Sequence, residues 1–184
     1  MVAWIVILLA LGLVIGPVLY LAPTRKDRRL AALRLEARRC GLVVELNSVR
    51  NLDAPAEELV SAGGERRAPV HDSVSYAMPL RARLEHLGPW RLLRSERTGW
   101  QFDSEREAPA GPDVLPALKP LLAGLPGDAV ALELDGGRLA CYWLERFPAN
   151  GETVGALRQS LVAMGEKLIA IDAELTRRLT ETDS

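Results

Sequence analysis

The residues whose types most suggest chemistry are His71, Asp72 and Ser73, which follow one another in the chain. A serine nucleophile, a histidine base and an orienting aspartate form the relay of acyl transfer, in which each group bonds to the next. Neighbouring residues on a strand point to opposite faces of the sheet. We therefore expect these three side chains to lie apart and to form no catalytic triad.

The other reactive residues give no stronger signal. Cys40 with a remote histidine would make a thiol nucleophile, but it ends a predicted helix and is expected to pack. Glu133 and Asp135 flank a predicted hairpin turn and are expected to be solvated. Only two cysteines and two histidines are present, without ligand-like spacing. We expect no catalytic residue, no cofactor and no metal.

Charge is distributed unevenly along the chain of 184 residues. Residues 24–39 hold seven basic and two acidic side chains, a net charge of +5. Because the whole chain carries −1, residues 40–184 carry −6. An acidic domain argues against nucleic acid as a partner, since the phosphate backbone requires a basic surface.

The segment 1–23 is predicted to be a transmembrane anchor. Residues 2–22 contain no charged side chain. As a helix they would span about 31 Å, which matches a hydrocarbon core of about 30 Å. Trp4 and Tyr20 lie near the two ends, where amphipathic rings favour the membrane interface. The basic residues after this segment place the C-terminal part in the cytoplasm of a bacterium and the N-terminus outside its inner membrane.

A basic juxtamembrane helix is expected over 24–41, ending at Gly41. Its first turn carries the residues predicted to lie at the membrane interface and contact lipids, Arg25, Lys26, Arg28 and Arg29. Arg34 and Arg38 are candidate partner contacts. Two interpretations stay open: a docking or lipid-binding arm, and a solvated linker whose arginines only set the topology.

Residues 42–180 are predicted to form one soluble domain, followed by a frayed tail over 181–184. Strands are expected at 42–46 and 74–78. Alternating apolar residues predict hairpins over 90–104 and 128–145, the second around an Asp-Gly turn. Short and long helices are expected over 114–123 and 153–180. The fold class is α+β: a transmembrane helix, then a cytoplasmic antiparallel sheet packed against the long C-terminal helix.

Two sets of apolar residues allow two interpretations each. Leu157, Leu161, Met164 and Leu168 recur at helical spacing, which suits a helix packed on the sheet or one that binds a partner or a second copy. The tryptophans of the predicted strands are expected in the core, although tryptophan is also enriched in partner sites. Self-association therefore stays open.

The N-terminal quarter of the chain resembles a known family. An apolar segment, then Pro23 with basic residues, a charged helix, and Gly41 before a valine-rich strand are similar to the small auxiliary subunit of the bacterial Sec preprotein translocase. The resemblance covers residues 2–46, and residues 70–184 have no counterpart in that family. It implies a non-catalytic accessory role at the membrane.

These observations favour a single-pass inner-membrane protein whose non-catalytic domain binds other membrane proteins, as an accessory of a secretion or envelope assembly. The alternative is a membrane-tethered ligand-binding or sensing domain. A pocket with convergent polar groups near the strand ends would favour ligand binding. A flat exposed patch around a tryptophan or the last helix would favour protein binding.

Overall fold

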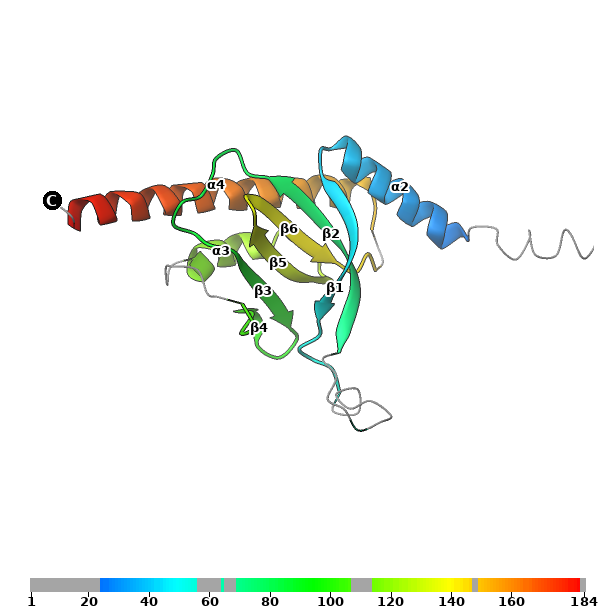
Figure 1. Cartoon of the computed structure of the whole chain (residues 1–184). Helices are drawn as coiled ribbons and strands as arrows, with labels where there is room; N and C mark the ends of the chain where they lie inside the picture. The colour runs from blue at the N-terminus through cyan, green and yellow to red at the C-terminus, as the bar shows by residue number, and fades with distance from the viewer. Residues whose placement is uncertain (1–23, 56–63, 65–68, 107–113, 147–148, 183–184) are drawn as a thin grey trace, which may run out of the picture. The chain divides into compact units, whose positions relative to one another are not determined.

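The computed structural model describes residues 24–55, 64, 69–106, 114–146 and 149–182. In these residues the elements are α2 (Arg25–Arg39), β1 (Val43–Arg50), β2 (Val70–Pro79), β3 (Trp90–Ser95), β4 (Gly99–Phe102), α3 (Val114–Leu122), β5 (Ala129–Asp135), β6 (Arg138–Trp143) and α4 (Gly151–Thr182). The chain divides into two units, Met1–Ala32 and Leu33–Ser184. The second unit holds one antiparallel six-stranded sheet in the order β1-β2-β6-β5-β3-β4 (Figure 1).

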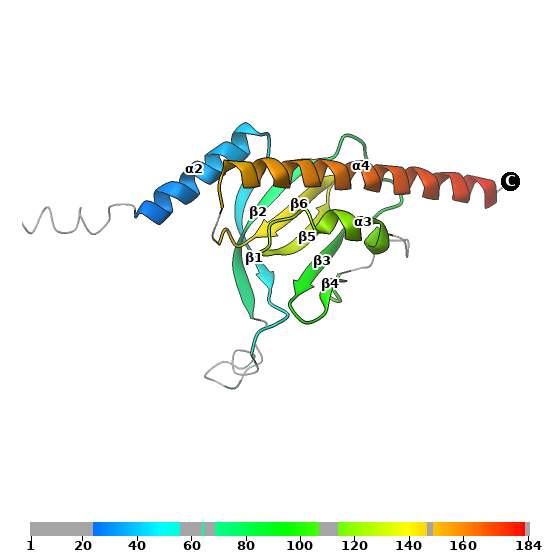
Figure 2. The same ribbon diagram turned by 180° about the vertical axis from the view of Figure 1, so that it is seen from behind.

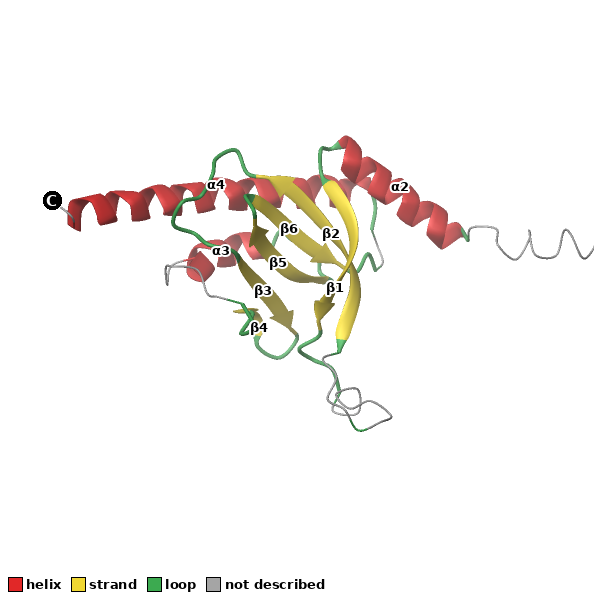
Figure 3. Cartoon of the chain, in the orientation of Figure 1, coloured by secondary structure: helices red, strands yellow, loops and turns green. Residues whose placement is uncertain are grey.

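Helices α3 and α4 lie against one face of this sheet. They are in front of the strands in Figure 2 and behind them in Figure 3. The opposite face, which we call the open face, has no helix against it in the described part of the chain. Alternate residues of each strand point to opposite faces, so one set of side chains forms the core with the helices and the other set lies on the open face.

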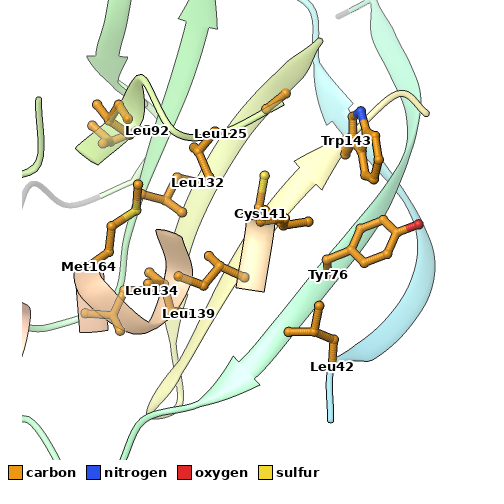
Figure 4. Packing of buried hydrophobic residues seen from close by; sticks show 14 of the residues in the cluster. Leu42, Tyr76, Leu92, Leu125, Leu132, Leu134, Leu139, Cys141, Trp143 and Met164 are labelled. Atoms are coloured by element: carbon orange, nitrogen blue, oxygen red, sulfur yellow. The ribbon is translucent and has the colours of Figure 1, made fainter. Parts of the chain in front are cut away.

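The core lies between the sheet and the helices (Figure 4). Trp90 and Trp143 are buried there, and the rings of Tyr76 and Trp143 are 5.4 Å apart. Helix α4 contributes a stripe of fully buried side chains, Val154, Leu157, Leu161, Met164 and Leu168. The spacing of this stripe is therefore that of a helix packed on a sheet, and these residues cannot contact a partner in the folded domain.

Local sequence explains where the elements begin and end. Thr24 and Asp27 form a capping box at the start of α2, in which the Asp27 amide donates to the Thr24 hydroxyl over 3.2 Å. Gly41 ends α2 at a φ of 82°, and the Leu42 amide donates to the Ala37 carbonyl over 3.0 Å. Gly136 and Gly137 both have positive φ in the turn between β5 and β6.

Both predicted hairpins are confirmed, as β3–β4 and β5–β6. Strands β1 and β2 are longer than the predicted 42–46 and 74–78. Eight consecutive residue pairs join them, from Val43 with Ala77 to Arg50 with Val70. The extra residues include Asn47 and Ser48, whose polar side chains interrupt the apolar pattern that predicts a strand. Helix α4 continues to Thr182, into the segment predicted as a frayed tail.

The predicted fold class is wrong as stated, because it began with a transmembrane helix. Within the part of the chain that the structure describes, no helix combines the length and the apolar character needed to cross a bilayer. Helix α4 has 32 residues, but nine of them are charged, so it is not apolar enough. The predicted anchor 1–23 lies outside the described residues. The single-pass inner-membrane localisation is therefore not supported.

A buried carboxylate links the second half of α2 to the end of β6. Glu145 follows β6, and its side chain is only 3% exposed. It accepts hydrogen bonds from the Tyr76 hydroxyl over 2.5 Å and from Arg34 Nε over 3.0 Å and Nη2 over 2.5 Å. The bond to Glu145 raises the pKa of the Arg34 guanidinium above its ordinary value. Arg34, a candidate partner contact in the sequence, is therefore engaged within the domain.

Replacing Glu145 by alanine should lower the free energy of unfolding by about 3 kcal/mol, because the buried Tyr76 hydroxyl and the partly buried Arg34 guanidinium would lose their partner. Urea unfolding at neutral pH measures the change. Glu36→Gln is the matched control, since the pair between Arg39 and Glu36 is exposed and should contribute about 0.5 kcal/mol or less. Equal losses in the two variants would contradict this role for Glu145.

A second carboxylate fixes the segment between β2 and β3. Asp172 of α4 is buried and accepts the backbone amides of Glu85 over 2.9 Å, His86 over 2.8 Å and Leu87 over 2.9 Å. Burial acts to raise the pKa of Asp172, but the three amides together lower it below its ordinary value of 3.8. Helix α4 thus holds a loop as well as the sheet.

The variant Asp172→Asn should be less stable than the wild type by about 1–3 kcal/mol at neutral pH, since an amide nitrogen cannot accept these bonds. A lowered pKa in the folded state gives stability that is present above the ordinary value and is lost as the pH falls through the folded value. The difference in unfolding free energy between the two proteins should therefore shrink below pH 3.8. A difference that stays constant in acid would contradict this assignment.

Candidate functional site in the open face of the sheet

The floor of the candidate site is made by two small side chains. Ala77 of β2 and Ala140 of β6 lie directly opposite each other, and Glu133 of β5 lies beside Ala140. In the same row, Arg91 of β3 is opposite Glu133. Long polar side chains therefore surround two methyl groups, and this leaves a depression in the open face.

We call this depression the hollow. Its volume is about 320 Å³. Its eleven lining residues come from five strands and from the segment after β4: Glu45, Asn47, Ser75, Ala77, Arg91, Arg106, Glu133, Asp135, Arg138, Ala140 and Tyr142. Three arginines and three carboxylates are among them, so the lining carries both signs of charge in equal number.

Glu133 is the centre of the charged groups in the hollow. It is 5% exposed. Its carboxylate accepts from Arg91 Nη2 over 3.1 Å, from Arg106 Nη1 over 2.7 Å and from the Tyr142 hydroxyl. The guanidinium of Arg91 also lies 5.5 Å from the centre of the Tyr142 ring. A carboxylate this buried persists only with such partners. They compensate the charge of Glu133, although the buried Nε of Arg91 has no hydrogen-bond partner among the described residues.

The network continues to the end of β1 and joins the two edges of the sheet. Arg50 Nη2 is 2.5 Å from Asp103 Oδ1, and Arg50 Nη1 is 2.7 Å from Glu105 Oε1. Arg91 reaches the same Asp103 carboxylate at 3.9 Å. Arg50 lies on one edge strand and Asp103 just beyond the other. The two ends of the sheet therefore approach each other across the open face.

A second set of contacts closes this end of the sheet. Val49 and Leu93 belong to one small apolar cluster on the open face. The Ser95 hydroxyl and the Glu96 amide both donate to Asp53 over 2.7 Å. These two bonds, led by that from the Glu96 amide, lower the pKa of Asp53. The turn after β1 is thereby fastened to the β3–β4 hairpin, and the hollow is fixed at one end.

Two neighbouring residues of β6, one on each face of the sheet, keep their protons at neutral pH. Burial, and then the hydrogen bond to Glu133, raise the pKa of Tyr142 to about 12. The phenol therefore keeps its proton at neutral pH and acts as a donor. Burial also raises the pKa of the Cys141 thiol, which lies on the core side of β6, so it has no nucleophilic character.

None of the predicted site residues that the structure describes is among the residues that line the hollow. Trp4 and Tyr20 lie outside the described residues. The predicted interface residues Arg25, Lys26 and Arg28 are exposed on α2, Arg29 is partly exposed there, and Arg38 is exposed near its end. Cys40 is partly buried at the end of α2, next to the core, as predicted.

The structure shows where the residues considered for catalysis and metal binding lie. His71 and Ser73 point to the face opposite that of Asp72, by the alternation of β2. Asp135 is exposed, as predicted, but the interpretation of Glu133 as solvated is wrong. Among the described residues, no three histidine, cysteine, aspartate or glutamate side chains gather in a way that could hold a metal ion.

Sequence reasoning missed the inner residues of the hollow, Arg91, Arg106 and Tyr142. One signal was available: Glu133 sits between Leu132 and Leu134 in a strand pattern. A carboxylate at the centre of such a strand, on the face away from the leucines, is stabilised by a cation opposite it on a neighbouring strand. The identity of that neighbour depends on strand order, which the sequence does not give.

Comparison with protein-family models, with curated proteins and with solved structures finds no significant match. The resemblance of residues 2–46 to the small translocase subunit therefore stays a prediction.

Glu133 and Asp135 form a matched pair for testing the network, since both are carboxylates of β5 that line the hollow. Glu133→Gln should lower the free energy of unfolding by about 2–4 kcal/mol, because it leaves two guanidinium groups without full compensation. Asp135→Asn at the exposed position should change it by about 0.5 kcal/mol or less. Chemical denaturation of both variants measures these changes. Similar losses of unfolding free energy in the two variants would mean that Glu133 is not the centre of the network.

Proposed function

We propose that this domain binds a small polar ligand in the hollow and carries out no reaction on it. The main support for this proposal is the pair Ala77 and Ala140, whose short side chains leave a space among long charged ones. Sites for small ligands are concave, with a few convergent polar groups. Their volumes begin at roughly 300 Å³, so the hollow suits a ligand at the lower end of the range.

The groups that the protein leaves available indicate the class of ligand. Glu133 is occupied by Arg91, Arg106 and Tyr142. Glu45, Asp135 and Arg138 stand exposed around the rim. Glu45 on β1 offers a carboxylate at one part of the rim, and Arg138, which is the register partner of Asp135 beside the β5–β6 turn, offers a guanidinium at another. This arrangement favours a molecule that carries both an ammonium and a carboxylate. The ligand we propose is a small zwitterion of the amino-acid type.

The protein-binding role favoured by the sequence also stays a proposal, but it requires another surface. The apolar residues of α4 on which it rested are buried. Trp90 and Trp143 are buried as well, so neither can form the exposed anchor of a partner site.

Binding is tested by thermal unfolding of the full chain, followed by tryptophan fluorescence, with each of the standard amino acids in turn. The full chain is kept in a mild non-ionic detergent, because residues 2–22 are uncharged. We expect at least one amino acid to raise the melting temperature. A ligand at about a hundredfold excess over its Kd should stabilise the fold by about 2.7 kcal/mol.

The variant Ala140→Leu should abolish this shift, because leucine fills the floor of the hollow. Ala170→Leu, on an exposed position of α4, is the matched control and should keep it. Arg138→Met should weaken binding without filling the space, and it serves if the first variant folds poorly. The proposal would be overturned if no amino acid raised the melting temperature, or if the rise persisted in Ala140→Leu. It would also be overturned if acetate and ethylamine, which carry one charge each, raised the melting temperature as much as the amino acid does.

A further inference from the structure

Two arginines share one carboxylate in the inner wall of the hollow. Arg91 Nη2 donates to both oxygens of Glu133 over 3.1 Å, and Arg106 Nη1 is 2.7 Å from Glu133 Oε1. The Tyr142 hydroxyl donates to Glu133 Oε2. Each oxygen of Glu133 therefore has two donors. A carboxylate offers about four acceptor sites, so Glu133 can accept no further hydrogen bond.

The two guanidinium groups still have donors to spare. Each has five N–H groups, and each contacts Glu133 through a single nitrogen. Arg91 Nη1 is 3.9 Å from Asp103 Oδ2, which is beyond hydrogen-bond distance. Among the described residues, Glu133 is the only carboxylate that pairs with Arg106. Both arginines line the hollow, so a ligand there meets donors that Glu133 cannot satisfy.

The inner wall also carries an excess of one positive charge. Its two arginines hold two positive charges against the one negative charge of Glu133. The carboxylates nearby belong to another group: Asp103 and Glu105 are paired with Arg50 at 2.5 Å and 2.7 Å, and neither carboxylate lines the hollow. Charges with little access to water are normally matched by opposite charges. An unmatched positive charge beside a cavity therefore suits an anionic group of a ligand.

This excess charge borders the same floor as the arginine of the rim. Glu133, which holds the two inner arginines, lies opposite Ala140 on the neighbouring strand, about 5 Å away. Arg138 lies two residues from Ala140 along β6, about 7 Å away. A molecule seated on Ala140 is therefore next to both positions. A zwitterion with its carboxylate on Arg138 would leave the inner wall unmatched, whereas a second carboxylate on the same molecule would match it.

We propose that the ligand of the hollow is an acidic amino acid, whose side-chain carboxylate binds Arg106 and Arg91 while its α-carboxylate binds Arg138. This inference rests on the proposed function, since it names the class of amino acid that the hollow receives. Arg106 is the residue that determines this specificity, because its side chain is 35% exposed against 17% for Arg91. A guanidinium and a carboxylate form a charge-assisted pair, which the amide of asparagine or glutamine cannot form.

Isothermal titration of the full chain at neutral pH, in a mild non-ionic detergent, compares each acidic amino acid with its own amide. Aspartate or glutamate should bind at least about tenfold more tightly than the corresponding amide, since hydrogen bonds between charged partners are the stronger ones. This comparison needs no variant, so it does not depend on whether a substituted chain folds. If the acids bind no more tightly than their amides, or fail to bind while other amino acids do, this inference is wrong and the proposed function stands. If no amino acid binds, both fall.

The variant Arg106→Gln tests whether the inner wall is the source of the preference. It should weaken the binding of the acid by about tenfold and leave the affinity for the amide nearly unchanged. Arg177→Gln is the matched control, because it also removes a guanidinium that is paired with a carboxylate, that of Glu174 on α4, and it should keep the full preference. Arg138→Met should weaken acid and amide by similar factors. A preference for the acid that survives in Arg106→Gln would contradict the role of this arginine.

Discussion

Alternate side chains of the long strands point to opposite faces of one sheet, and α3 and α4 pack against only one of those faces. This division sets the character of every strand. Leu132, Leu134 and Cys141 turn towards the helices, while Glu133 and Tyr142 turn the other way. The open face is therefore free to carry charge, provided that each buried charge finds a partner. The network around Glu133 and Asp103 meets that requirement by joining strands that are far apart in the sequence.

The sequence predicted those parts of the fold that depend on local pattern. The hairpins β3–β4 and β5–β6 follow from alternation and turn residues, and α4 follows from its helical periodicity. It did not predict the full length of β1 and β2, because their ends hold polar residues whose strand conformation depends on pairing. The transmembrane interpretation rested on an uncharged segment, its two terminal aromatic residues and the basic residues that follow. That segment lies outside the residues that the structure describes, and no described helix supports it.

The candidate site was less predictable than the fold for a related reason. Arg50, Arg91 and Arg106 come from different parts of the chain, and each alone looks like a solvated arginine. Only the strand order β6-β5-β3 places Arg91 opposite Glu133, and only the curvature of the sheet brings Arg50 to Asp103. The arginines that sequence reasoning did single out, on α2, were chosen for their density near an apolar segment. One of them, Arg34, is engaged by Glu145 inside the domain.

The position of α4 after the six strands has a consequence for synthesis. All six strands precede it, so a chain that is still being made completes its sheet residues before the stripe from Val154 to Leu168 exists. Until then the face that carries Trp90 and Trp143 has no cover from α4. Domains generally fold as units, and this one lacks a wall of its core until α4 has been translated. The core of this domain is therefore completed only once α4 has been made, and until then its buried tryptophans lack this cover.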